Sequence, residues 1–261
     1  MSTPRFLPRQ DGRHAVVTGA GTGIGRAIAL RLAQEGARVS LLGRRVEPLE
    51  ETARLVAEVG GRAAVHPCDI RDEASVRAAF AALEGPIDVL CANAGVGGAN
   101  VPGPEDRFVD VVQTNLMGTY WCVRAAQQRL APGPGPRHIV VTSSVLGRFG
   151  VPGYTAYCAS KTGLIGMVRA LALELASKNV LVNAICPGWV GTEMAYSGIQ
   201  GMADGMGVPY EEAMRIAMSA VPLGRMATPE EIAGMVAWLV SPDAAAVTGQ
   251  ALDQNGGSWM G

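Results

Sequence analysis

The sequence predicts a single doubly wound α/β domain, with a parallel sheet of about seven strands and helices on both faces. Short apolar runs rich in β-branched residues alternate with longer amphipathic stretches along the 261 residues. Hydrophobic residues make up 48% of the chain and charged residues 17%, which is enough for a large core. Glycine is abundant, at 34 residues, which suits a sheet whose turns approach a ligand closely.

The apolar runs are short enough for strands and carry too few polar positions for a half-exposed sheet. We therefore expect strands buried on both faces at 14–18, 38–42, 63–67, 87–92, 138–142 and 180–185.

The stretches between these runs have the four-residue spacing of helices. In the first helix Ile24, Ile28 and Leu32 share one face, and Gly36 marks its end. Thr228, Pro229 and two glutamates predict the start of the last helix. Further helices are expected at 48–59, 73–83, 107–130 and 159–177, with the last one at 229–240. The Met-rich segment 189–220 differs in kind, and we interpret it as a substrate lid inserted within one domain that spans 1–261.

Composition excludes several classes of protein. The net charge of −1 favours neither nucleic acid nor an anionic membrane as a partner. The five cysteines are widely spaced without a CxxC pair, and the three histidines stand alone, so we expect no disulfide and no metal site. The polar start 1–12 does not resemble a signal peptide, and no apolar run is long enough to span a membrane. A soluble, cytoplasmic protein is expected.

A glycine-rich turn follows the first strand and opens the first helix. Gly19, Gly23 and Gly25 would let the backbone approach a pyrophosphate, and the helix start, with Thr22 and Ile24, would offer its free N–H groups. A glycine cluster alone also fits a tight turn, but a strand before and a helix after favour a dinucleotide-binding domain of the Rossmann type.

The end of the second strand bears on the choice of cofactor. NAD-binding domains usually carry an acidic residue there, whereas this chain has Gly43, Arg44 and Arg45. An arginine can hold the 2′-phosphate of NADP, so we predict NADP and keep NAD as the alternative, because Thr22 is neutral. The other interpretation is that both arginines are merely solvated and bind no phosphate.

Polar residues also follow the third and fourth strands. Asp69 could accept a hydrogen bond from the adenine amine, or it could cap the helix that begins near Glu73. After the fourth strand, Asn93 could bridge backbone groups, while small residues leave room for a cofactor.

Four residues suit proton transfer to a ketone. Tyr157 and Lys161 lie four apart on a predicted helix, hence on one face, and an ammonium would lower the pKa of the phenol. Ser144 could hold the substrate oxygen or act as a loop or N-cap serine. Asn115 is unfavourable inside a helix, which indicates either a bent helix with a water bound to Lys161 or a mere irregularity.

Taken together, these residues resemble the short-chain dehydrogenase/reductase family, from about Gly12 to Gly257. The matching segments, in order, are TGAGTGIG at 18–25, CDI at 68–70, NAG at 93–95, Asn115, Ser144, YCASK at 157–161 and NAICPGWVGT at 183–192. The C-terminal run 221–252 is similar to bacterial 3-oxoacyl and aromatic polyketide ketoreductases, and also to hydroxyacyl dehydrogenases.

The resemblance implies a role for each matching position. Tyr157 would be the acid/base, Lys161 would lower its pKa and hold the nicotinamide ribose, Ser144 would orient the substrate oxygen, and Asn115 would complete a proton relay. Residues expected to contact the cofactor are Gly19, Thr22, Gly23, Ile24, Gly25, Arg44, Arg45, Asp69, Ile70, Asn93, Ala94, Gly95, Tyr157, Lys161, Pro187, Gly188, Val190 and Thr192. Those expected to line an apolar substrate pocket, beside Ser144, are Leu146, Phe149, Val151, Tyr154, Trp189 and Met194.

The expected activity is hydride transfer between NADP(H) and a ketone or secondary alcohol, with a 3-oxoacyl-like or cyclic ketone as substrate. One alternative is an NAD-dependent secondary alcohol or hydroxyacyl dehydrogenase. A more remote one is a non-catalytic regulator that senses the cofactor. The family resemblance also implies a homo-oligomer, commonly a homotetramer, that shares the helices at 107–130 and 159–177.

Overall fold

Parallel strands form a single sheet of seven in the computed structural model, which describes residue 7 and residues 9–261. The order across the sheet is β3-β2-β1-β4-β5-β6-β7. The predicted start at 1–12 lies partly outside the described residues. The strands are β1 His14–Thr18, β2 Arg38–Gly43, β3 Arg62–Pro67, β4 Val89–Ala92, β5 Arg137–Thr142, β6 Val180–Pro187 and β7 Ala251–Gln254.

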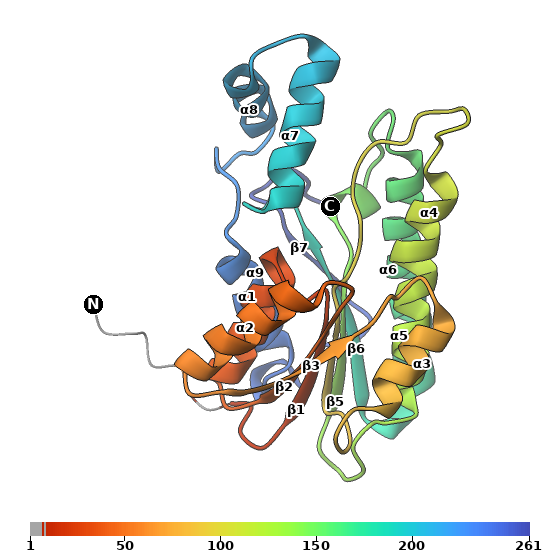
Figure 1. The fold of residues 1–261 in the computed structure, drawn as a ribbon, viewed down its shortest axis with the longest axis vertical. Coiled ribbons are helices and arrows are strands. Elements are labelled where there is room, and N and C mark those ends of the chain that lie inside the picture. The colour runs from red at the N-terminus through yellow and green to blue at the C-terminus, as the bar shows by residue number, and fades with distance from the viewer. Residues whose placement is uncertain (1–6, 8) are drawn as a thin grey trace.

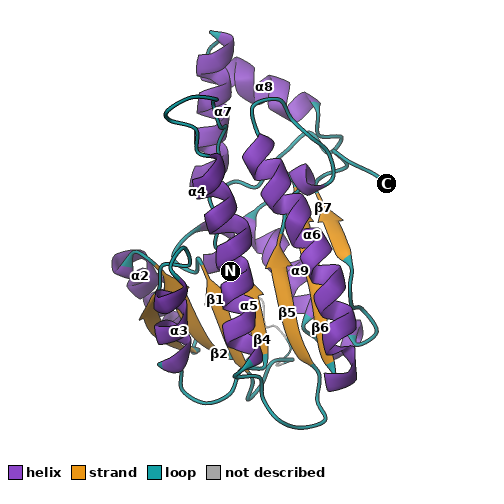
Figure 2. Cartoon of the chain, turned by 90° about the vertical axis from the view of Figure 1, so that its right-hand side faces the viewer, coloured by secondary structure: helices purple, strands orange, loops and turns teal. Residues whose placement is uncertain are grey.

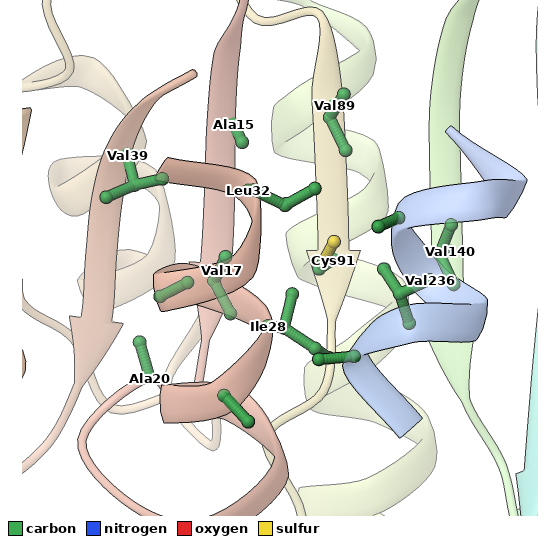
Figure 3. Packing of buried hydrophobic residues seen from close by; sticks show 14 of the residues in the cluster. Ala15, Val17, Ala20, Ile28, Leu32, Val39, Val89, Cys91, Val140 and Val236 are labelled. Atoms are coloured by element: carbon green, nitrogen blue, oxygen red, sulfur yellow. The ribbon is translucent and has the colours of Figure 1, made fainter. Parts of the chain in front are cut away.

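Helices cover both faces of this sheet (Figure 1), as the sequence predicts for a doubly wound domain. One face carries α1 Gly23–Gln34, α2 Val46–Glu58 and α9 Pro229–Leu239; the other carries α3 Glu73–Ala81, α5 Thr119–Gln127 and α6 Thr155–Leu175. On the first face, Ile28 and Leu32 of α1 meet Val236 of α9 over the strands (Figure 3). Each face therefore has its own apolar core. Because all strands are parallel, their carboxyl ends meet at one edge of the sheet.

Local signals set several of the helix ends. The side chain of Thr228 accepts a hydrogen bond from the N–H of Glu231, whose carboxylate accepts from the N–H of Thr228, so α9 begins with a full capping box. Gly36 follows α1 with a φ of +100°, a conformation that favours glycine. The predicted signals at both helices are confirmed.

Two predictions about the elements are wrong. The strand at 63–67 is not buried on both faces, because β3 is the outermost strand and several of its side chains are exposed. The helix expected at 107–130 is divided into α4 Phe108–Val112, a π-helix Gln113–Gly118 and α5. The wider turn fits the close packing of Gly118, where a β-carbon would lie 2.6 Å from the carbonyl oxygen of Ile70.

The segment 189–220 forms two helices, α7 Glu193–Met206 and α8 Tyr210–Ser219. Figure 2 shows both rising beyond the end of the sheet to which the strands point. They share a small apolar core of their own around Ile199 and Ala213. None of the helices among the described residues is long and apolar enough to cross a membrane.

Candidate active site

The glycine turn between β1 and α1 is too tight for a side chain at Gly19 or Gly25. A β-carbon on Gly25 would lie 2.1 Å from the carbonyl oxygen of Gly19, and one on Gly19 would lie 2.9 Å from Cα of Ala94. Gly19 and Gly23 also have φ values of +66° and +52°. The N-cap residue Thr22 makes no side-chain capping bond within the described chain, so the N–H groups at the start of α1 are not capped by their own N-cap residue. This is the geometry that an anionic phosphate requires.

A surface cavity lies between this turn and the end of β2. Gly21, Thr22, Gly43, Arg44 and Arg45 are among the residues that line it. Both arginine side chains are exposed. Because Gly43 has no carboxylate to repel a phosphate, this donor set fits the 2′-phosphate of NADP better than the free ribose hydroxyl of NAD.

The residues after β3 lie in two different environments. Asp69 pairs with Arg71 at 2.7 Å, and this contact lowers the pKa of its carboxyl group, with Arg44 adding a smaller effect. Helix α3 is capped by Asp72, which accepts from the N–H of Ala74, so the capping alternative for Asp69 is wrong. The side chain of Ile70 is 6% exposed, and both this side chain and the carbonyl oxygen of Ile70 pack against Gly118 in the core.

Asn93 holds three strand ends together, as the sequence indicates. Its Nδ2 donates to the carbonyl of Thr18 at 3.2 Å, and its Oδ1 accepts from the hydroxyl of Thr142, also at 3.2 Å. The hydroxyl of Thr18 in turn accepts from the backbone N–H groups of Asn93 and Ala94, both at 3.0 Å. The ends of β1, β4 and β5 are therefore fixed at the edge where the site lies.

The π-helix brings Asn115 to the same edge. Its Oδ1 accepts from the N–H of Val96 at 2.8 Å, and its Nδ2 donates to the carbonyl of Val96 at 2.9 Å and to Oγ of Ser160 at 3.2 Å. A β-carbon on Gly95 would lie 3.0 Å from Oδ1 of Asn115 and 3.6 Å from Nζ of Lys161. Gly95 is thus the small residue that lets both side chains approach. The helix is irregular at Asn115, as both interpretations of this residue require, and the water bound to Lys161 stays a prediction.

Tyr157 and Lys161 lie on one face of α6, with Nζ of the lysine 5.5 Å from the centre of the phenol ring. Nζ donates to the carbonyl of Thr142 at 2.8 Å. Burial lowers the pKa of Lys161 to about 8. The hydrogen bond from Lys161 to Thr142 therefore connects α6 to the end of β5.

The protonation of Tyr157 differs from the sequence expectation. Burial raises the pKa of the phenol above its ordinary value of 10.0, and the opposing effect of a hydrogen bond with Ser144 is smaller. Ser144 also accepts from the N–H of Leu146 at 3.1 Å, so it caps the short 3₁₀ turn Val145–Gly147 as well as facing Tyr157. The phenol in this arrangement is a protonated donor at neutral pH.

The end of β6 completes the edge. Thr192 caps α7, and a β-carbon on Gly23 would lie 3.0 Å from its Cγ2, so this loop lies against the glycine turn. Gly188 packs on Asn255, where a β-carbon would lie 2.9 Å from Cα. Pro187 ends the strand, while Val190 is 4% exposed with its side chain in the core.

The residues expected to line the substrate pocket differ in their exposure to solvent. Phe149 and Met194 are exposed, and Leu146, Val151 and Tyr154 are half-buried. Trp189 packs against Gly198 of α7. A β-carbon on Gly97 would lie 3.0 Å from Sδ of Met194, so the start of α7 reaches across to the loop that follows β4.

Several supporting residues carry no signal in the sequence. Arg26 donates to the carbonyl of Gly21 at 2.6 Å and to Oγ1 of Thr52 at 3.2 Å, which fixes the glycine turn. Ser160 donates to the carbonyl of Tyr157 at 2.8 Å while it accepts from Asn115. Ser143 donates to the carbonyl of Lys161 at 2.8 Å. Each has at least one partner 18 or more positions away in sequence.

Comparison with known proteins gives a consistent result. A family model described as enoyl-(acyl carrier protein) reductase matches residues 19–258. The chain is 43% identical to a Streptomyces coelicolor protein whose assigned name is ketoacyl reductase, over 96% of this chain and 98% of that one. It is 34% identical to the 3-oxoacyl-[acyl-carrier-protein] reductase of Vibrio harveyi, over 96% of this chain and 98% of the other.

A solved structure shows the same fold. A variant of the actinorhodin polyketide ketoreductase, crystallised with NADPH, superposes with a TM-score of 0.89 and 39% identity. The match covers 97% of this chain and 99% of that one.

Proposed function

The chain belongs to the short-chain dehydrogenase/reductase family of NAD(P)-dependent oxidoreductases, and we propose that it uses NADPH to reduce a ketone of the 3-oxoacyl or cyclic type. The observation that carries the proposal is the meeting of Ser144, Tyr157, Lys161 and Asn115 at the sheet edge that also bears the glycine turn.

Tyr157 would supply the proton that reduction of a ketone requires. NADPH supplies a hydride when bound, and the carbonyl oxygen that becomes an alkoxide then needs a proton. A phenol that stays protonated at neutral pH can donate it, while the hydroxyl of Ser144 orients the same oxygen. Lys161, held by Thr142, places a positive charge beside the ring that favours the phenolate left after transfer.

The cofactor contacts follow from the same edge. Arg44 and Arg45 would bind the 2′-phosphate, and the N–H groups after Gly19 and Thr22 would bind the pyrophosphate. The named relatives include a ketoreductase crystallised with NADPH, which supports NADPH over NAD. Asp69 would receive the adenine, and Thr192 and the backbone of Gly188 would face the nicotinamide.

Helices α7 and α8 are the proposed lid over the substrate. Met194 and Phe149 are exposed and would lie at the mouth of the site, which suits a large apolar substrate. The contact of Met194 with Gly97 would close the mouth, and opening of the lid would then limit product release.

Assembly and location complete the proposal. Val109, Met117 and Tyr120 are exposed along α4, the π-helix and α5, and Leu173 of α6 is 84% exposed. Such apolar side chains on these helices support a homo-oligomer, with a homotetramer as the form common in the family. All five cysteines lie within the described residues as free thiols, which supports a reducing, cytoplasmic compartment.

The test is the variant Tyr157→Phe, which removes the proton donor and keeps the ring. We expect it to bind NADPH as the wild type does, by fluorescence titration, and to lose turnover of ethyl acetoacetate by several orders of magnitude. Nearly full turnover in this variant would contradict the assignment.

Comparing NADPH plus ketones with NAD plus secondary alcohols separates the reductase from the alcohol or hydroxyacyl dehydrogenase. Absence of turnover with all of them would favour a regulator.

A further inference from the structure

The N-terminal end of the catalytic helix α6 lacks a cap from its own sequence. Tyr154 is its N-cap residue and makes no side-chain capping bond to any described residue. The first N–H groups of a helix have no partner within the helix, and Ala156 is only 1% exposed, so water cannot serve its N–H. The next residue is Tyr157, and its placement depends on this turn.

A residue from a distant loop supplies the missing cap. Oδ1 of Asn100 accepts from the N–H of Ala156 at 3.0 Å. Asn100 is 8% exposed, and its own N–H donates to the carbonyl of Gly153 at 2.8 Å, just before α6. The loop at 96–107, which joins β4 to α4 (Figure 1), is therefore fixed to the start of the catalytic helix.

Asp106 orients this amide. Nδ2 of Asn100 donates to Oδ1 of Asp106 at 3.2 Å, and the same oxygen accepts from the N–H of Phe108 at 3.0 Å, at the start of α4. This fixes which side of the Asn100 amide faces Ala156. At its other end the loop is held by the two bonds between Val96 and Asn115.

The loop thus connects the two helical segments that carry the proton-transfer groups: α4 and the π-helix with Asn115, and α6 with Tyr157 and Lys161. We propose that Asn100, oriented by Asp106, is a positioning residue that caps α6 and sets the place of Tyr157 against Ser144. The proposal rests on the proposed function, because it assigns Asn100 a role in the same proton transfer. A displacement of a reacting group by about 1 Å can cost a factor of about 100 in rate, so the loss of one cap is enough to be measured.

The effect should fall mainly on turnover. The proposed phosphate contacts at the glycine turn and Arg44 follow β1 and β2 and include no residue of this loop, so the Kd for NADPH should change far less than kcat. We expect Asn100→Ala to lower kcat for ethyl acetoacetate about tenfold, which corresponds to a displacement of the phenol smaller than about 1 Å.

A pair of substitutions tests the geometry. Asn100→Asp keeps an oxygen for the N–H of Ala156 but places a second carboxylate against Asp106, so kcat should fall. Asp106→Asn keeps an oxygen for Phe108 and for the Asn100 amide, so this matched control should keep kcat near the wild-type value. The exchange Asn100→Asp with Asp106→Asn removes the repulsion between two carboxylates, so kcat should rise above that of Asn100→Asp alone.

An unchanged kcat in Asn100→Ala would overturn the proposal. So would a folded exchange variant, with wild-type Kd for NADPH, whose kcat is no better than that of Asn100→Asp alone. If Asn100→Ala does not fold, the comparison of Asn100→Asp with the exchange variant decides. A wild-type protein that reduces no ketone refutes the proposed function instead, so the two failures are distinct.

Discussion

Lys161 is an ammonium group held in an unfavourable place, and removing it should stabilise the protein. Burial lowers its pKa from the model-peptide value of 10.5 to about 8. Since a tenfold change in protonation equilibrium corresponds to about 1.4 kcal/mol, the fold loses about 3 kcal/mol at pH 7 by keeping this group charged. Lys161→Met also removes the hydrogen bond to Thr142, a loss of about 1 kcal/mol. We expect a net gain of about 2 kcal/mol in the free energy of unfolding, together with loss of turnover.

The pH dependence has a fixed sign. Below about pH 8 both the folded and the unfolded chain carry the proton, so the unfavourable contribution is fully present. Between pH 8 and 10.5 the folded chain releases it while the unfolded chain keeps it, so wild-type stability recovers with rising pH. The advantage of Lys161→Met should therefore vanish by about pH 10.

Denaturant unfolding at pH 7 and pH 10 measures both effects. Lys178→Met is the matched control, because Lys178 is exposed and its substitution should change neither stability nor its pH dependence. A Lys161→Met protein that is less stable than the wild type at pH 7, or equally favoured at both pH values, would refute the reasoning.

Two further results are expected. Arg44→Asp should raise KM for NADPH about 10- to 100-fold and lower KM for NAD, because one charge-assisted contact to the 2′-phosphate is lost. Steady-state kinetics with both cofactors checks this. An unchanged cofactor preference would remove Arg44 from the site. His138 is 1% exposed, and burial, with repulsion from Arg13, lowers the pKa of its imidazole to about 3. Its contribution to stability is complete above about pH 6.5 and is lost as the pH falls, by about 2 kcal/mol between pH 7 and pH 5, so His138→Phe should flatten the acid limb of the unfolding curve. If the acid limb keeps its slope in His138→Phe, this imidazole is excluded as a cause of the loss of stability at low pH.

The sequence alone predicted the fold class, and it named most of the residues that the structure brings together at the candidate site. Strands such as His14–Thr18 are short apolar runs, and their pattern depends only on neighbours along the chain. The glycine turn and the Tyr157–Lys161 pair are likewise local, because four-residue spacing on a helix places two side chains on one face. Arg44 and Arg45 could be predicted because a strand end fixes their position.

Other features depend on partners far away in sequence. The exposure of β3 follows from its place at the edge of the sheet, and the π-helix at Asn115 accompanies the close packing of Gly118 on Ile70. The pKa of Tyr157 is raised rather than lowered, because burial, which a spacing pattern does not report, outweighs the hydrogen bond from Ser144.

The same distinction separates Tyr157 from Asn100. The type and spacing of residues determined which groups could exchange a proton, since that chemistry belongs to the side chains themselves. Only the tertiary structure decided how those groups are held, because the cap on α6 comes from a loop 56 positions earlier in the chain. Contacts at such separations form only when the whole sheet has brought its strand ends together.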